Sequence, residues 1–175
     1  AMTGPLLNLN IETPKASLKS YWEGGPRNYL GLAIPGFPNL FTITGPGSPS
    51  VLSNMPVSIE QHVDWITECI GHCIETECSS IEAQEQSAEI WTDHVRETAD
   101  ATLLPKVQHS WYLGANIPGK PRVFMPYAGG LNMYRKICDN IAEEGYKGFN
   151  FNSEKARDTS KPLDFISSEG FVLGV

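Results

Sequence analysis

The chain has 175 residues, a formal net charge of −7 at pH 7 and an isoelectric point near 5.0. This length suits one domain with a buried core, and the acidic balance argues against nucleic acid and anionic membranes as partners. Because no apolar run reaches the length of a membrane span and the first residues lack a signal-peptide pattern, we expect a cytoplasmic protein without a membrane span.

The first part of the chain predicts short elements separated by turns rich in Gly and Pro. Residues 6–11 (LLNLNI) alternate weakly between apolar and polar types, which predicts a short strand. Residues 15–23 predict a short amphipathic turn that ends at Trp22. Residues 39–44 (NLFTIT) predict a short apolar strand, and residues 45–56 predict a loop.

A long helix is predicted to start at Ser58, because Ser58 and Gln61 have the spacing of a capping box. The apolar positions that we expect to face inward repeat at helical spacing. They are Ile59, Val63, Ile66, Ile70 and Cys73.

Two further long helices are predicted after a polar linker at residues 77–80. One spans about residues 85–104 and ends at Pro105; the other spans about residues 130–144 and ends before Gly145. Their inward positions are predicted to be Ala88, Trp91, Val95, Ala99 and Thr102 in the first and Tyr134, Ile137, Cys138 and Ile141 in the second. The predicted fold class is therefore α+β and mainly helical, with three long helices and a few short strands.

The four cysteines are Cys69, Cys73, Cys78 and Cys138. Cys69 and Cys73 lie four residues apart on one predicted helix, and His72 lies between them. A zinc site would normally also need a C-x-x-C pair or a matching distal pair, and the sequence has neither. We therefore predict buried thiols and no metal site.

Four long motifs occur in order along the chain. They are residues 36–50, which run from GFPNLF to TGPGSPS, residues 55–65 (MPVSIEQHVDW), residues 110–124 (SWYLGANIPGKPRVF) and residues 146–149 (YKGF). In these motifs the chain resembles the flavin-dependent Baeyer–Villiger monooxygenases, in particular the phenylacetone and cyclohexanone monooxygenase branch. The resemblance runs from about Leu7 to Phe151. It implies the C-terminal part of the FAD domain of those enzymes.

The resemblance also divides the chain into a monooxygenase-like domain at residues 3–152 and a C-terminal tail at residues 153–175, which diverges from the family. The tail is polar at first and ends in apolar residues. Two interpretations of it stay open, a segment that docks on a bare surface and a partly ordered extension.

The resemblance also implies segments that this sequence does not contain. Family members bind FAD and NADPH through G-x-G-x-x-G turns, in which glycines let the backbone approach a pyrophosphate at a helix N-terminus. The partial match at residues 45–50 carries Pro46 and Pro49, which donate no amide hydrogen, and it ends in Ser50. The histidine- and tryptophan-containing fingerprint and the active-site arginine of the family also have no counterpart. We therefore expect no cofactor bound by this chain alone.

The resemblance implies that residues 50–55 and the loop around Trp111 form the substrate side of the flavin site. The residues that we expect to line an apolar substrate are Val51, Leu52, Met55 and Trp111. The polar residues that could act on a substrate carbonyl are Ser53, His109 and Tyr112. Lys120 and Arg122 resemble family residues near the cofactor phosphates, although without a cofactor they would be solvated charges. We expect His62 and His94 on the polar faces of their helices.

Three hypotheses about function stay open. The first is a cofactor-free cyclase or isomerase, which could guide a pericyclic step such as a Diels–Alder reaction of an apolar terpenoid or polyketide intermediate. The second is one subunit of a split Baeyer–Villiger monooxygenase, with a flavoprotein partner chain that brings FAD and NADPH. The third is a non-catalytic partner of a complete monooxygenase. The sequence favours the first narrowly, because it alone makes the short chain sufficient.

The resemblance also predicts association. In the family, the strand that corresponds to residues 40–44 pairs with strands that precede this segment. Without those neighbours, its ladder groups and the adjacent helix faces would be bare. We therefore predict a homodimer or a larger assembly.

Overall fold

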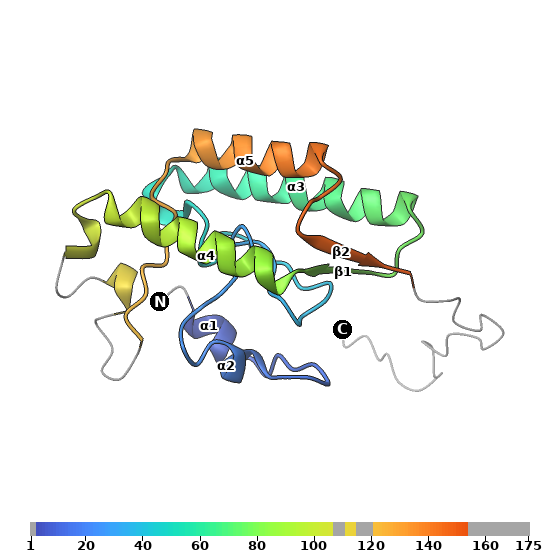
Figure 1. Cartoon of the computed structure of the whole chain (residues 1–175), viewed down its shortest axis with the longest axis horizontal. Helices are drawn as coiled ribbons and strands as arrows, with labels where there is room; N and C mark the ends of the chain where they lie inside the picture. Colours follow the sequence, from blue (N-terminus) through green and yellow to red (C-terminus); the bar gives the residue numbers. More distant parts are fainter. Residues whose placement is uncertain (1–2, 107–110, 115–120, 154–175) are drawn as a thin grey trace, which may run out of the picture.

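The computed structural model describes residues 3–106, 111–114 and 121–153. The described chain is mainly helical, with two short strands (Figure 1). Its elements in order are α1 (Gly4–Leu7), α2 (Leu18–Tyr21), η1 (Ser50–Leu52), α3 (Met55–Glu75), β1 (Ser80–Ala83), α4 (Glu85–Asp100), η2 (Leu104–Lys106), η3 (Trp111–Leu113), α5 (Leu131–Glu143) and β2 (Phe149–Asn152). The predicted fold class is thus confirmed.

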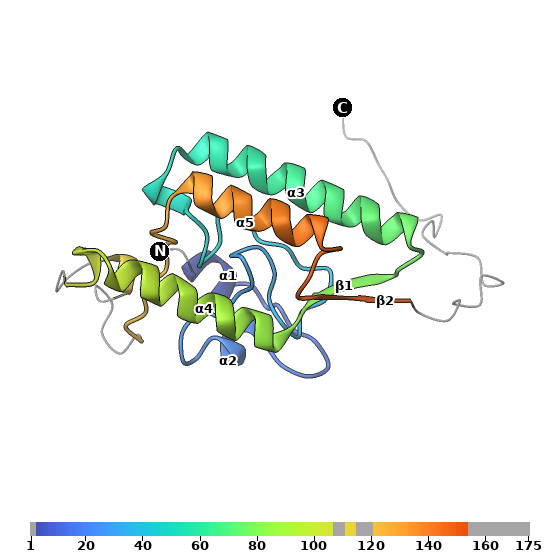
Figure 2. The same cartoon turned by 45° about the horizontal axis from the view of Figure 1, so that its top comes forward.

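The helices α3 and α5 lie side by side, and α4 lies on another side of the core, as Figures 1 and 2 both show. The strands β1 and β2 form a two-stranded antiparallel sheet, in which Ser80 is opposite Asn152 and Ala83 is opposite Phe149. This sheet joins the end of α3 to the start of α4 and receives the chain that leaves α5. The short helices α1 and α2 lie on the far side of the core from α3 and α5.

Trp65 on α3 lies at the centre of the main core. Its side chain is 3 % exposed, and its ring packs against Tyr146 and Phe149 at centroid distances of 5.2 and 5.6 Å. Its indole N–H donates a hydrogen bond of 2.9 Å to the carbonyl of Cys138 on α5. A buried Trp needs such an acceptor, and here it ties α3 to α5.

The helix α3 begins before the predicted capping box. Asn54 is the N-cap residue, with an extended backbone, and its side chain accepts a hydrogen bond from the Val57 amide. Pro56 lies in the first turn, where a missing amide hydrogen costs nothing. Ser58 and Gln61 are instead buried inside the helix. The capping-box prediction was therefore wrong, because Asn54 with Pro56 supplies an earlier start.

The inward stripe predicted for α3 was also largely wrong. Ile66 and Cys73 are buried, as predicted. The residues that face the core are instead mixed in polarity: Ser58, Gln61, His62, Trp65, Ile66, Cys69 and Cys73. Four aliphatic residues on a neighbouring face are exposed by 39, 41, 42 and 71 %, and we call them the outer stripe: Ile59, Val63, Ile70 and Ile74. The prediction failed because α3 has apolar residues on two faces, and the face that contains Trp65 is the one that packs in the core.

Both strands predicted in the first part of the chain were wrong. Residues 6–11 include the end of α1, and residues 39–44 contain only an isolated bridge between Ala33 and Phe41. Positive φ angles of 61° at Asn39 and 54° at Thr44 interrupt the extended backbone. The actual strands, β1 (Ser80–Ala83) and β2 (Phe149–Asn152), lie in segments for which we predicted no strand.

The predictions for α2, α4 and α5 were confirmed. Ala88, Trp91, Val95 and Ala99 are buried on α4, and so are Tyr134 and Cys138 on α5. The helix α4 ends at Asp100, four residues earlier than predicted, so Thr102 lies outside it. Within the described ranges, no helix combines the length and the apolar character that a bilayer crossing requires.

Candidate functional site

The turn at residues 45–50 is a rigid part of the candidate site. The Ser48 hydroxyl donates to the Gly45 carbonyl at 2.8 Å, and the Tyr127 amide donates to the Ser48 carbonyl at 2.7 Å. The Trp91 indole N–H donates to the Gly47 carbonyl at 3.0 Å, which fastens the turn to α4. A Cβ atom on Gly31 would lie 2.5 Å from the Ser48 amide nitrogen, so this close approach requires glycine. The turn is therefore held from three sides.

The loop that follows leads directly into α3. The Ser53 hydroxyl donates to the Ser50 carbonyl at 2.9 Å and lies 2.6 Å from the hydroxyl of Ser58. These contacts give Ser53 a role in fixing the loop to the helix. Leu52 is 37 % exposed and Met55 is half-buried, so both offer apolar surface at the start of α3. The side chain of Val51, a predicted substrate contact, lies outside the described part.

The other predicted site residues come from the segment before the third long helix. Tyr112 is half-buried, its ring centroid lies 6.3 Å from that of Phe124, and its carbonyl accepts a hydrogen bond from Met125. His109, Lys120 and the Trp111 side chain lie outside the described residues. The described contacts place Ser53 at the start of α3 and Tyr112 beside the end of α4. The structure thus does not gather them into one described cluster.

Arg122, which we compared with phosphate-binding residues, donates a hydrogen bond of 3.2 Å to the carbonyl of Pro105. This contact joins residues 121–125 to the turn after α4. The contact leaves a role of Arg122 in binding untested.

His62 is a buried residue that the sequence analysis misplaced. Its side chain is 0 % exposed, and its Nδ1 atom accepts a hydrogen bond of 3.0 Å from the Thr44 amide. Burial lowers the pKa of His62 to about 4, so the ring is neutral at pH 7. Its Nε2 atom has no partner among the described residues. The prediction that His62 lies on a polar face was therefore wrong.

His94 was also predicted on a polar face, but it is half-buried against two rings. Its centroid lies 5.4 Å from that of Trp91 and 5.6 Å from that of Tyr127, and its Nε2 atom lies 3.4 Å from the Tyr127 hydroxyl. It therefore packs against Trp91 and Tyr127, the two residues that form hydrogen bonds to the turn at residues 45–50. Neither histidine is placed as a free general base.

The cysteines are free thiols, as expected. Burial raises the pKa of Cys69 and of Cys138 to about 12, so both remain protonated and unreactive at neutral pH. Within the described ranges, no group of His, Cys, Asp and Glu side chains has the arrangement of a metal site. The thiols therefore contribute to packing.

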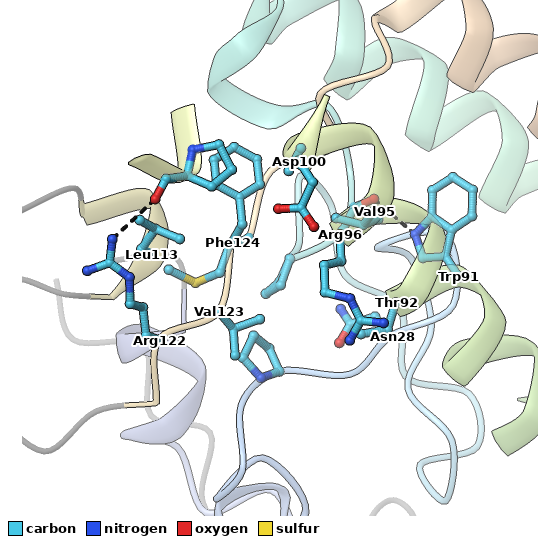
Figure 3. Close-up of a pocket in the computed structure, with 16 residues that line it drawn as sticks. Asn28, Trp91, Thr92, Val95, Arg96, Asp100, Leu113, Arg122, Val123 and Phe124 are labelled. Carbon is cyan, nitrogen blue, oxygen red and sulfur yellow. Dashed lines mark hydrogen bonds between the residues drawn. The ribbon is translucent and has the colours of Figure 1, made fainter. Parts of the chain in front are cut away.

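A cavity of about 380 Å³ lies between α4 and residues 121–125 (Figure 3), and the sequence analysis missed it. Its wall combines apolar side chains with a few polar ones. Asn28 and the turn residues Pro46 and Gly47 lie on this wall. The sequence offers no signal for this cavity, because its wall comes from segments that are far apart in the chain.

No family model matches the chain. Cyclohexanone 1,2-monooxygenase from an Acinetobacter species is 37 % identical over 165 residues, which are 94 % of this chain and 30 % of that protein. A Baeyer–Villiger monooxygenase from Pseudooceanicola batsensis is 41 % identical over 130 residues, which are 74 % of this chain and 23 % of that protein. The solved structure of a steroid monooxygenase bound to NADP shares 45 % identity with a TM-score of 0.81, over 88 % of this chain and 29 % of that one.

The chain thus spans less than a third of the length of these relatives. The likeness covers both the sequence and the fold, because the TM-score and the identity are high over the same large share of the chain. The turn at residues 45–50, α3 and residues 121–125 lie within the matched segment, which runs through nearly all of the described residues. The chain is therefore related to the Baeyer–Villiger monooxygenases and corresponds to a C-terminal portion of them.

Proposed function

We propose that this chain forms the substrate-side portion of a flavin-dependent Baeyer–Villiger monooxygenase. The FAD- and NADPH-binding portion would belong to a further polypeptide segment, in the same chain or in a partner chain. The complete unit would insert an oxygen atom beside the carbonyl of an apolar ketone. The observation that carries this proposal is the identity of 37 % over 94 % of the chain to a cyclohexanone monooxygenase.

The outer stripe of α3 supports the need for a further segment. Ile59, Val63, Ile70 and Ile74 are exposed by 39 to 71 % along one face of a helix of 21 residues. A continuous aliphatic face of this kind is typical of a surface that another element covers. The relatives are more than three times longer than their matched segment, so they have additional polypeptide that could cover such a face.

The turn at residues 45–50 does not have the features of a pyrophosphate-binding turn. The described turn at residues 45–50 uses its amides and carbonyls internally and against Met125 and Tyr127. The prolines Pro46 and Pro49 have no amide hydrogen to offer a pyrophosphate. The residues present therefore do not form a complete cofactor cradle, and we derive no step through the flavin.

The part of this chain in the proposed function is to bind and orient the substrate. Leu52 and Met55 offer apolar surface at the start of α3, and we propose that Val51 and Trp111 extend this wall. Tyr112 and His109 remain candidates for hydrogen bonds to the ketone carbonyl. Ser53 is better suited to positioning, because its hydroxyl is already engaged with Ser50 and Ser58. A neutral apolar ketone agrees with a wall that carries few charges.

Reconstitution tests the proposal. The chain would be co-expressed with a shortened cyclohexanone monooxygenase. This truncated relative lacks the segment that matches the present chain over 165 residues. The expected result is a co-purifying complex that retains flavin absorbance and converts cyclohexanone to its lactone when NADPH is added. The truncated relative with its own C-terminal segment is the positive control, and this chain alone is the negative control.

Each alternative predicts a different result. A stable complex that contains flavin but gives no lactone would support a non-catalytic partner. If the positive control works and this chain neither associates nor restores flavin binding, the proposal is wrong. The relatives named above are monooxygenases, and no contact among the described residues favours a cyclisation, so the cyclase hypothesis has no support.

A further inference from the structure

Two cysteines meet at the end of α3, and they differ from the inert pair Cys69 and Cys138. Cys73 is 6 % exposed on the last turns of α3, and Cys78 is half-buried just before β1. Figure 1 shows that the chain runs from the end of α3 through a short turn into β1. The thiol of Cys73 donates a hydrogen bond of 3.3 Å to the carbonyl of Cys78. Cys73 and Cys78 are therefore in contact across this turn.

The turn after α3 is a Schellman motif, which brings its first and last residues together. The Cys78 amide donates to the Cys73 carbonyl at 2.8 Å, and the Glu77 amide donates to the Ile74 carbonyl at 3.1 Å. Glu77 has the left-handed conformation that this motif requires, with a φ angle of 55°. Residues that a backbone hydrogen bond joins directly have Cα atoms roughly 5–6 Å apart, a separation that disulfides span. The backbone therefore suits a bond between Cys73 and Cys78.

The two thiols also interact with each other. Burial raises the pKa of Cys73, and the neighbouring Cys78 thiol raises it further through charge repulsion and a side-chain hydrogen bond. The Sγ atom of Cys78 lies 3.2 Å from the hydroxyl of Thr76, and that hydroxyl donates to the His72 carbonyl at 2.7 Å. Thiols are weak hydrogen-bond donors and acceptors, so the sulfur atoms lose little when they turn toward each other.

The two thiols differ in access, which gives them different roles. Cys78 contacts Thr76 on the exposed side of the turn, where a reagent in solution can reach its sulfur. Cys73 needs no such access, because its reaction partner is Cys78. An attack within the turn has a high effective concentration, which offsets the raised pKa of Cys73. Cys69 does not compete, since it is 0 % exposed and burial raises its pKa to about 12.

We propose that Cys73 and Cys78 are a redox-sensitive modification site that forms a reversible disulfide when the chain meets a small disulfide such as glutathione disulfide. The Cys78 thiolate attacks one sulfur of glutathione disulfide, which gives a mixed disulfide on Cys78 and releases one glutathione thiolate. Cys73 then loses its proton and attacks the Cys78 sulfur, which forms the bond between the two cysteines and releases the second glutathione.

In total, the two protein thiols lose two electrons and two protons, and glutathione disulfide gains them as two glutathione molecules. The bond fastens the last turn of α3 to the residue that leads into β1. Because the site lies at the end of α3, away from residues 50–55, the inference does not depend on the proposed function.

Oxidation of the folded chain, followed by mass spectrometry, tests the proposal. The chain is incubated with excess glutathione disulfide, quenched with acid, unfolded and alkylated. Two of the four cysteines should then escape alkylation, and no glutathione should remain attached. Digestion after glutamate separates residues 69–75 from residues 78–82, so the disulfide should link these two peptides.

Three variants assign the roles of the cysteines. Cys73→Ala should stop the reaction at its first step and retain one glutathione on Cys78. Cys78→Ser should form neither the adduct nor the disulfide. Cys69→Ala is the matched control, because it also removes a buried thiol of α3 but should still form the disulfide. If Cys73→Ala fails to fold, Cys78→Ser and the peptide map of the unmodified sequence remain decisive.

The melting temperature distinguishes a disulfide of the folded chain from one that forms only after unfolding. The oxidised chain should melt about 3–8 °C higher than the reduced chain, because the bond closes a short loop in the unfolded state, and dithiothreitol should reverse the shift. Four alkylated cysteines after oxidation, a link that includes Cys69 or Cys138, or an oxidised chain that melts no higher than the reduced one would each overturn the proposal.

Discussion

The two faces of α3 differ in how completely this chain covers them. On the inner face, Trp65 and Cys69 are 3 % and 0 % exposed, and Trp65 makes a hydrogen bond to α5. On the outer stripe, Ile70 and Ile74 are 42 % and 71 % exposed. The inner face therefore closes a core within this chain, whereas the outer stripe has apolar surface that a further segment could cover. The inner face thus belongs to the core of this chain, and the outer stripe is the surface that we propose for association.

The free energy that would be gained by covering the outer stripe can be estimated. Complete burial of an aliphatic side chain stabilises by about 1.5–3 kcal/mol, and the outer stripe is already about half covered. Covering the four residues would then contribute about 4 kcal/mol in total. This is comparable to the loss of one large core residue, so an associated segment would change the stability of the whole unit noticeably.

The largest effect is expected on the inner face. Trp65→Ala should lower the free energy of unfolding by about 3–5 kcal/mol, because it opens a large cavity and leaves the Cys138 carbonyl without its donor. Urea denaturation followed by circular dichroism would measure this. Trp65→Phe keeps most of the volume and should cost less. A loss below about 1 kcal/mol for Trp65→Ala would show that the inner face does not carry the core.

The inner face also predicts a pH dependence through His62. Its pKa is lowered from 6.5 in the unfolded chain to about 4 by burial, so the unfolded state binds a proton that the folded state does not. The free energy of unfolding is therefore highest above about pH 6.5, and it decreases as the pH falls from 6.5 toward 4. The loss amounts to about 3 kcal/mol.

Denaturation of the chain and of His62→Phe between pH 4 and 7 would measure this effect. The phenylalanine variant cannot bind the proton, so it should show a smaller decrease in stability toward low pH. Carboxylates titrate in both proteins, and the difference between the two curves isolates His62. Parallel curves for the two proteins would contradict a neutral buried ring.

The comparison of the two faces also shows how far the sequence could predict the structure. The patterns of α4 and α5 were informative because each helix has a single apolar stripe, with Trp91 and Tyr134 at its centre. Gly145 marks the end of α5, whereas α4 ends at Asp100, before Pro105. The pattern of α3 was ambiguous. Its isoleucines repeat at helical spacing as well as its buried residues do, so periodicity alone could not decide which face enters the core.

The misplaced strands have a different cause. Residues 39–44 have the composition of a strand, but a strand needs a neighbour, and the described chain provides only the bridge from Ala33 to Phe41. The cavity at Asn28 could not be predicted either, because its wall comes from segments that are far apart in the sequence. Motif resemblance predicted the family, yet it could not show that Ser53 is engaged with Ser58.

A smaller effect is expected at the start of α3, where the N-cap residue Asn54 stabilises the whole helix and thus both of its faces. Asn54→Ala removes the side-chain acceptor of the Val57 amide and should lower the free energy of unfolding by about 0.5–1 kcal/mol. Asn54→Asp should retain stability, because aspartate caps helices equally well. Thermal denaturation of both variants would check this. If Asn54→Ala and Asn54→Asp behave alike, the helix does not depend on this cap.

The smallest effect on the isolated chain is expected on the outer stripe. Ile70→Ser should change the free energy of unfolding by less than about 1 kcal/mol, because the side chain is already 42 % exposed. The same change should weaken association about tenfold, whether the partner is the truncated monooxygenase or, as the predicted homo-oligomer requires, a second copy. Ile90→Ser on α4 is the matched control, since Ile90 is 63 % exposed and lies outside the stripe.

Light scattering and titration with the truncated monooxygenase would measure both kinds of association for the two variants. If Ile70→Ser and Ile90→Ser weaken association equally, the stripe has no special role and the contact is a general apolar one. If only Ile70→Ser weakens it, the stripe is the interface. A clean monomer that does not bind the truncated monooxygenase would mean that the two faces of α3 differ in exposure but not in function.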